Sequence, residues 1–223
     1  MPQPSVAKPP KIYSHEPRWP ALLALLAVGG LHLTLPEPLT VGPGWLLLVL
    51  IAVLLVPSIL AHRAGLVGAS NILGYLLSGV VTLAMVISLV LLVRALPAHK
   101  QAPIDLLRSA AALWITNILV FASWYWRLDA GGPHARSLRE VHSNGAFLFP
   151  QMTQQHIAKT TLGGAGWRPG FVDYLFLAFN TSTALSPADT GVLSRWAKGL
   201  MMVQSTISLS TIVLLAGRAV NIL

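Results

Sequence analysis

Five long apolar runs alternate with polar segments along the chain, and most are long enough to cross a membrane. The runs cover residues 21–35, 45–62, 71–93, 109–126 and 199–217. A helix of about 20 apolar residues crosses the hydrocarbon core of a bilayer, which is about 30 Å thick. Only the run at 21–35 is short for a span. The pattern predicts an all-α integral membrane protein with five transmembrane helices.

The polar segments divide the chain into four parts. Residues 1–20 contain six prolines, which exclude a stable helix and predict a mobile tail. Residues 21–127 form a predicted four-span bundle. Residues 128–170 form a long polar loop with no predicted secondary structure, and a loop of this length is usually functional or disordered. Residues 171–223 hold the remaining apolar segment and the last span.

A short apolar segment at residues 171–182 is the most informative part of the pattern. As a helix it is about 18 Å long, which is too short to cross the bilayer. A return rich in hydroxyl and amide groups follows it and ends at Pro187. Irregular backbone at this depth is tolerated only where protein or water covers it. We expect a re-entrant helix; an interfacial helix in the headgroup plane and a short true span are the alternatives.

Composition supports the membrane assignment and excludes several classes of protein. Of the 223 residues, 54% are hydrophobic and only 10% are charged, too few to solvate a soluble domain of this size. The chain has no cysteine, which excludes disulfides, cysteine metal sites and thiol catalysis. The net charge is +8, but the basic residues lie mostly outside the apolar runs, which indicates contact with lipid headgroups and no nucleic acid.

Motifs for catalysis are lacking in the sequence. No nucleotide-binding loop, carboxylate pair or nucleophile motif is present, and the seven histidines show no metal-ligand spacing. We therefore expect no enzyme activity, no cofactor and no metal site.

From the fourth run onward, the order of segments resembles the pore module of tetrameric potassium-channel-like proteins. In that module an outer helix, a pore helix, a filter strand and an inner helix follow one another. Residues 174–221 can be aligned with it almost without gaps. Asn180–Thr183 matches the threonine pair before the filter, and Asp189 lies in the turn toward the inner helix. The remainder of the chain is similar to a family of small five-span bacterial membrane proteins, which implies a multi-pass protein of the cell membrane.

The filter positions depart from the potassium-channel pattern. A potassium filter reads Thr-Val-Gly-Tyr-Gly, and its glycines allow the carbonyl groups to converge on the ion. The matching residues are Thr183-Ala184-Leu185-Ser186-Pro187, without a glycine, so we expect no potassium selectivity. The resemblance implies a homo-oligomer, such as a tetramer, with a pore for small inorganic ions. Its predicted lining is Asn180, Thr181, Ser182, Thr183, Ala184, Leu185 and Ser186, with Asp189 at the pore mouth.

The last apolar run carries a polar face. Gln204, Ser208 and Thr211 recur at the spacing that places residues on one side of a helix. This face predicts either a pore-lining inner helix or hydrogen bonds between packed helices. Asn117, within the fourth run, is expected to bond to a neighbouring helix.

A channel-like protein is the function that the sequence favours. A non-conducting membrane scaffold or accessory subunit is the alternative. A secondary transporter is the third hypothesis. It ranks last because the two matching broken-helix halves typical of transporters are lacking.

The distribution of basic residues predicts the orientation. With five spans and the amino terminus inside, only Arg94, Lys100, Arg108 and Arg218 of the 15 Lys and Arg residues lie outside. Because basic residues concentrate in cytoplasmic loops, the amino terminus is expected inside. This places the re-entrant helix on the cytoplasmic side, opposite to a potassium channel. Either the pore is inverted, or the first run does not span, or the charge rule fails for this chain; we follow the charge rule.

Overall fold

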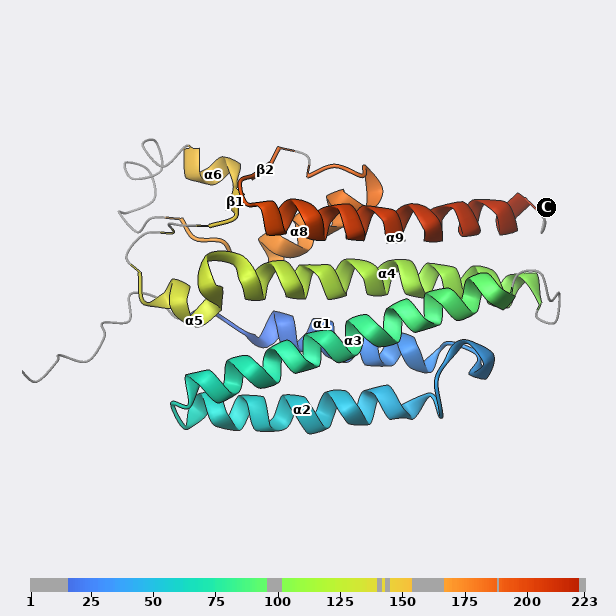
Figure 1. Ribbon diagram of the computed structural model, residues 1–223, viewed down its shortest axis with the longest axis horizontal. Helices are drawn as coiled ribbons and strands as arrows, with labels where there is room; N and C mark the ends of the chain where they lie inside the picture. The colour runs from blue at the N-terminus through green and yellow to red at the C-terminus, as the bar shows by residue number, and fades with distance from the viewer. Residues whose placement is uncertain are drawn as a thin grey trace, which may run out of the picture.

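Five long helices lie roughly side by side along the longest axis of the molecule (Figure 1). The computed structural model describes residues 16–95, 102–139, 142, 145–153, 167–187 and 189–220. The long helices are α1 (Trp19–Leu33), α2 (Trp45–Arg63), α3 (Val67–Ala95), α4 (Pro103–Leu128) and α9 (Arg195–Val220). Of these, α2, α3, α4 and α9 are long and apolar enough to cross a membrane, whereas α1 is shorter. The predicted helical fold is confirmed, and its four long apolar helices are consistent with a multi-pass membrane protein; a fifth span stays a prediction that depends on α1.

The amino-terminal helix begins inside the predicted tail. Residues 1–15 of that tail lie outside the described residues, but α1 starts at Trp19 and includes Pro20. Proline is tolerated in the first turn of a helix because its missing N–H would have no partner there. The predicted tail of 20 residues is therefore too long by two.

α2 and α3 form an antiparallel hairpin. The chain reverses at Gly65, whose φ of +75° lies in the left-handed region that favours glycine. Serine hydroxyls join the two helices close to the turn: Ser70 Oγ donates to the carbonyl of Ser58 at 3.0 Å, and Ser58 Oγ donates to that of Ser70 at 3.2 Å. Both polar side chains are thereby satisfied between the helices.

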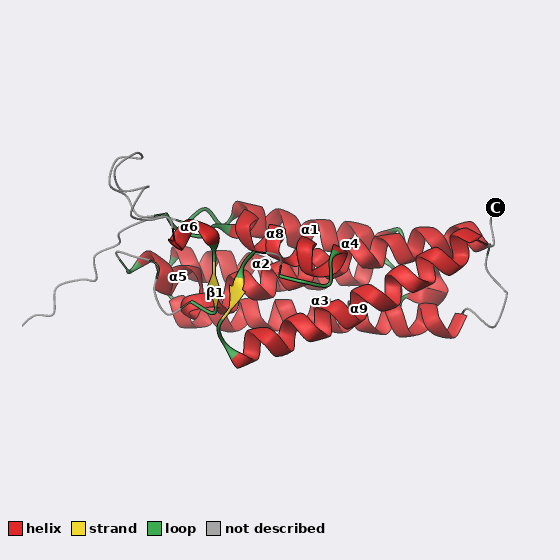
Figure 2. Ribbon diagram, turned by 90° about the horizontal axis from the view of Figure 1, so that it is seen from above, coloured by secondary structure: helices red, strands yellow, loops and turns green. Residues whose placement is uncertain are grey.

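The segment 128–170, predicted without secondary structure, contains several short elements. They are η2 (Asp129–Gly131), α5 (Gly132–Ser137), β1 (Phe147–Leu148) and α6 (Pro150–Thr153); η1 (Glu37–Leu39) lies between α1 and α2. β1 pairs antiparallel with β2 (Gly191–Val192), so that Phe147 faces Val192 and Leu148 faces Gly191. Strand pairing across the sequence thus ties part of this segment to the start of α9 (Figure 2).

The short apolar segment is a helix, α8 (Phe171–Thr183), which packs against α4 and α9. The structure confirms the helix predicted at 171–182 and extends it by one residue. Asp173 caps its start, because the carboxylate accepts a hydrogen bond of 2.7 Å from the backbone N–H of Gly170.

Apolar side chains fill the space between the helices and also cover the outside of the bundle. Leu77 and Val81 of α3 and Phe121 of α4 are almost completely buried in the core. On the outer surface, Val53 and Leu83 are each 60% exposed. A continuous apolar exterior would be unfavourable in water and suits a lipid environment.

One end of the bundle carries most of the positive charge. We call it the basic end: α1, α3 and α9 begin there, and α2 and α4 end there (Figure 1). Its described basic residues are Arg18, Arg63, Arg127, Arg136, Arg139, Arg168, Arg195 and Lys198. At the opposite end the described Lys and Arg side chains are Arg94 and Arg108. By the positive-inside rule, the basic end is expected in the cytoplasm.

A pair of single-cysteine variants tests this orientation, since the natural chain has no cysteine. Ala64 is exposed at the basic end, and Ala102 is exposed at the opposite end. We expect a membrane-impermeant thiol reagent to label Ala102→Cys in intact cells. Ala64→Cys should react only after permeabilisation. The reverse pattern would show that the basic end faces outward. Labelling of both variants in intact cells would show that α3, the helix between these two positions, does not cross the membrane.

Candidate functional site

α8 ends halfway along the two long helices against which it packs. Ser182, near its carboxyl end, contacts Asn117 in the middle of α4 and Ser208 in the middle of α9. At the other end of α8, the ring of Phe171 packs edge-on against Trp126, close to the end of α4. α8 is about 20 Å long by the rise of an α-helix. It therefore leads from the basic end to the middle of the bundle.

A buried hydrogen-bond network, which we call the Gln204 network, holds the end of α8. Gln204 Nε2 donates to the carbonyl of Ala178 at 2.7 Å and to Ser182 Oγ at 3.0 Å. Tyr125 donates its hydroxyl proton to Gln204 Oε1. Asn117 Nδ2 donates to Ser182 Oγ and to the backbone carbonyl of Gln204, each at 3.3 Å. Side chains from α4, α8 and α9 are thus joined in one polar cluster.

The Gln204 network is closed to solvent within the single chain. Asn117, Tyr125, Ser182 and Gln204 all have 0% exposed surface. The expectation that Asn117 bonds to a neighbouring helix is confirmed. The sequence does not single out Tyr125, because nothing in its spacing distinguishes it from the tryptophans on either side.

The polar face predicted on the last helix points into the bundle. Gln204, Ser208 and Thr211 are completely buried. Ser208 Oγ donates to the carbonyl of Ser182 at 2.6 Å and accepts from Trp114 Nε1 at 3.1 Å. A side chain that lines a pore must present its polar atom to a surface. Within the chain, Gln204 and Ser208 make hydrogen bonds between packed helices, as the packing alternative predicts, whereas Thr211 donates to carbonyls of α9 itself.

The predicted filter residues divide between the interior and the surface. Thr181 and Ser182 are buried, and Thr181 Oγ1 donates to the carbonyl of Leu177 within α8. Asn180 and Ser186 are partly exposed. The exposed members of the set are Thr183, Ala184 and Leu185.

Residues 184–187 and 189–190, which we call the return, have no regular secondary structure and lead back to β2 at the basic end (Figure 1). Leu185 has a φ of +52°, in a region that non-glycine residues rarely adopt. Asp189, predicted at a pore mouth, is exposed in this segment. Residues 184, 185 and 189 of the return therefore lie on the outer surface, whereas Thr190 at its end is buried.

α9 has two more hydroxyl groups on its exposed side, and one of them, that of Thr206, lines a pocket with Leu185 and Pro187 of the return. Thr206 and Ser210 are exposed and lie one turn apart. The sequence shows that these two residues share one side of the helix. It does not show whether this side or the side of Gln204 is buried. Only the packing against α4 and α8 shows which hydroxyl groups remain accessible.

A second buried polar cluster fixes the start of α8 at the basic end. Asp129 is completely buried and accepts a hydrogen bond of 2.6 Å from the Tyr174 hydroxyl. The backbone N–H of Ala146 also donates to this carboxylate, and His142 Nε2 lies 3.3 Å from it. α8 is therefore held by polar contacts at both of its ends.

Among the described residues, no three His, Asp or Glu side chains gather in a way that could hold a metal ion. Comparison of the chain with protein-family models, curated proteins and solved structures finds no match. The geometry of α4, α8, α9 and the return is therefore what points to a function.

Replacing Gln204 by leucine should destabilise the fold. The Gln204→Leu variant leaves the Tyr125 hydroxyl and the Ala178 carbonyl without their partners in a buried site. We expect a loss of about 1–3 kcal/mol in the free energy of unfolding, measured by denaturant titration in mixed micelles. The control Thr206→Val, on the exposed side of the same helix, should change this free energy by less than about 0.5 kcal/mol. Equal effects of the two substitutions would contradict the role assigned to the network.

Proposed function

We propose that this chain is the subunit of a channel-like membrane protein that forms a passive pathway for small ions between copies of itself. The observation that carries the proposal is the depth at which α8 ends. Its last turn is bonded to the middle of α4 and of α9, two helices that are long and apolar enough to cross a membrane. A helix that enters from one face and stops at mid-depth is the arrangement of a pore helix.

The exposed return supports an oligomer. Residues 184 and 185 are exposed and lie directly after the end of α8, so their backbone would be at the depth of the hydrocarbon core. Irregular backbone at that depth is not tolerated against lipid, because each unsatisfied polar group costs several kcal/mol. Copies of the chain around a common axis would cover the return and leave water along the axis.

The exposed hydroxyl groups supply a lining for such an axis. Thr183 at the end of α8 and Thr206 on α9 are exposed beside the return, and Ser210 is exposed one turn further along α9. Their hydroxyl protons are donated to backbone carbonyls of their own helices, which leaves oxygen lone pairs to face water or a cation. The lining is sparse and lacks the carbonyl ring of a potassium filter, so the pathway proposed here is weakly selective.

Leu185 is an apolar residue in the middle of this surface. Its side chain is 44% exposed and projects from the segment that would approach the axis. Rings of apolar side chains can close a pore by excluding water. We propose that the ring of Leu185 side chains is the narrowest part of the pathway.

Conduction by the purified full-length protein in planar bilayers tests the proposal. We expect ionic current that falls in the Thr183→Leu variant, because a hydroxyl group of the lining is replaced by a larger apolar side chain. The matched control is Thr34→Leu, which changes an exposed threonine at the end of α1, away from α8 and the return. Current in this control should equal that of the natural chain.

The opposite results would favour the accessory subunit. If cross-linking shows an assembled oligomer in the bilayer and no current flows for any common ion or voltage, the oligomer does not conduct. The exposed return would then be a surface for contact with another protein. Current that is equal in all three proteins would also contradict the lining proposed here.

A further inference from the structure

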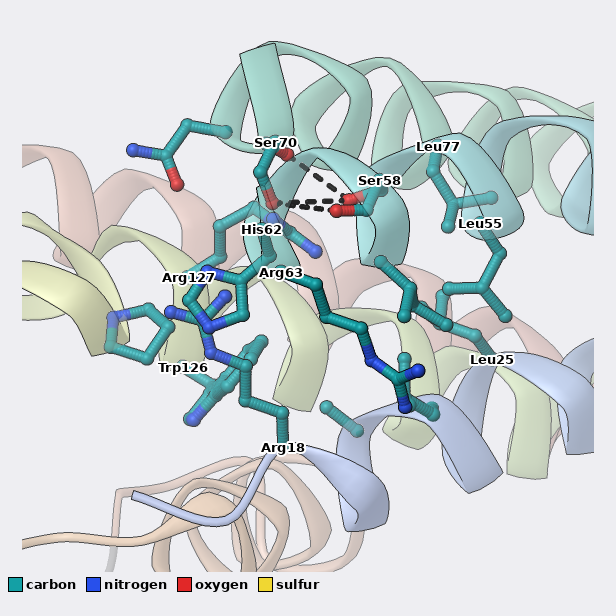
Figure 3. A pocket seen from close by; sticks show the side chains of 15 residues that line it. Arg18, Leu25, Leu55, Ser58, His62, Arg63, Ser70, Leu77, Trp126 and Arg127 are labelled. Carbon is teal, nitrogen blue, oxygen red and sulfur yellow. Dashed lines mark hydrogen bonds between the residues drawn. The ribbon is translucent and has the colours of Figure 1, made fainter. Parts of the chain in front are cut away.

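A pocket at the basic end gathers positive charge from three helices. It has a volume of about 150 Å³ and lies between the start of α1, the turn from α2 to α3, and the end of α4 (Figure 3). Arg18 precedes α1, His62 and Arg63 end α2, and Arg127 lies at the end of α4. Figure 3 shows Arg18 and Arg127 beside His62, with Arg63 reaching across toward α1.

Arg127 is fixed in the wall of the pocket by aromatic contacts. Its guanidinium lies 5.8 Å from the ring centre of Tyr75 and 5.7 Å from that of Trp126. It also lies against Gly74 of α3, where a Cβ atom would come within 1.8 Å of Nη1. Arg127 Nε is buried, and no described residue accepts a hydrogen bond from it. This donor is therefore held rigidly without a polar partner.

The carboxylates at this end are bound to other groups. Glu16 pairs with Arg136 at 2.9 Å, and Asp129 lies beside His142 at 3.3 Å. Among the described residues these are the ion pairs within 4 Å, so none is formed by Arg18, Arg63 or Arg127. Clustered cations without a carboxylate at ion-pair distance favour an anion as a further partner, although Glu16 lies close enough to Arg18 to act on its charge.

The other groups of the pocket agree with an anionic ligand. Burial lowers the pKa of Arg18, Glu16 raises it, and the nearby charge of Arg136 lowers it further. His62 Nδ1 is buried and has no partner among the described residues. An anion beside Arg18 and His62 would offset the cost of burying the positive charge of Arg18 and would accept a hydrogen bond from the His62 ring.

Apart from Ser58, Ser70 and Asn71, the rest of the lining is apolar, and this distinguishes a lipid from a free ion. The inner wall of the pocket, which we call the leucine wall, consists of the partly exposed Leu22 of α1 and Ile59 of α2 together with the buried Leu25, Leu55 and Leu77. The hydroxyl bonds between Ser58 and Ser70 keep α2 and α3 together beside it. A phosphate group among the arginines with a hydrocarbon chain along the leucines would match both parts of the lining.

We propose that this pocket binds the phosphate group of an anionic phospholipid from the leaflet at the basic end. Basic pockets between transmembrane helices on the cytoplasmic side are known to bind such headgroups. The phosphate lies near Arg127, Arg18 and His62, and an acyl chain lies over the leucine wall. The pocket is separate from the return and does not depend on conduction.

Lipid retention by the full-length protein in detergent tests the proposal. We expect native mass spectrometry to show phosphatidylglycerol bound in preference to phosphatidylcholine. Arg127→Gln should weaken phosphatidylglycerol binding about fivefold, the effect of one arginine near a headgroup. The control Arg108→Gln removes an exposed arginine from the other end of the same helix and should leave binding unchanged. If Arg127→Gln does not fold, Arg18→Gln at the edge of the pocket replaces it, with the same expected direction.

A competition experiment distinguishes the two sources of phosphate. Excess inorganic phosphate should not displace phosphatidylglycerol if the leucine wall contributes to binding. If inorganic phosphate does displace phosphatidylglycerol from the natural chain, and does not do so from Arg127→Gln, the ligand of the site is the free ion. This result would overturn the proposal of a lipid ligand. Equal binding of phosphatidylglycerol and phosphatidylcholine, or equal loss in Arg127→Gln and Arg108→Gln, would overturn the site itself.

Discussion

The depth of α8 is set by the hydrogen bonds that a glutamine side chain makes between three helices. Gln204 offers two donors and one acceptor, and the structure uses them on Ala178, Ser182 and Tyr125. In the interior of a membrane protein no water can replace these partners, so each must be found within the protein. Sliding α8 by one turn along α9 would leave several buried polar atoms unpaired at once. The network therefore fixes the position of α8 along α9, and with it the depth at which the return begins.

Two arginines at the basic end show how differently the structure treats similar charges. Arg136 is surrounded by acceptors: its guanidinium donates to Glu16 and to the carbonyls of Trp126 and Asp129. Arg127 faces aromatic rings and the pocket. The first arrangement is complete and stabilises the junction of α4 and α5. The second leaves capacity for a ligand, because aromatic faces attract a cation without using its hydrogen-bond donors.

The sequence predicted the positions of the helices well because membrane spans are encoded by simple runs of apolar residues. The prediction of a short helix from Phe171 onward followed from the same rule, and the structure extends it by only one residue. Prediction failed where partners are distant in sequence. The strand at Phe147 depends on pairing with residues more than 40 positions later, and no local pattern of residues 128–170 reveals it.

The polar residues of the candidate site illustrate a second limit. Gln204 and Thr206 are two positions apart, and the sequence contains a hydroxyl or amide group on both sides of the helix. Periodicity finds the stripe that holds Gln204 but does not say whether it faces water, lipid or another helix. The Asn117 side chain on α4 and the serine at the end of α8 decide this, since they supply the partners.

Gly74 has no functional group, yet it determines where a charge is located. A methyl group at this position would overlap the guanidinium of Arg127, which now occupies the space beside the α3 backbone. With any larger residue, the end of the Arg127 side chain would have to shift away from the α3 backbone, which would change its position against Trp126 and Tyr75. The position of one positive charge at this end of the bundle thus depends on a neighbouring residue that carries no charge and has the smallest side chain of all.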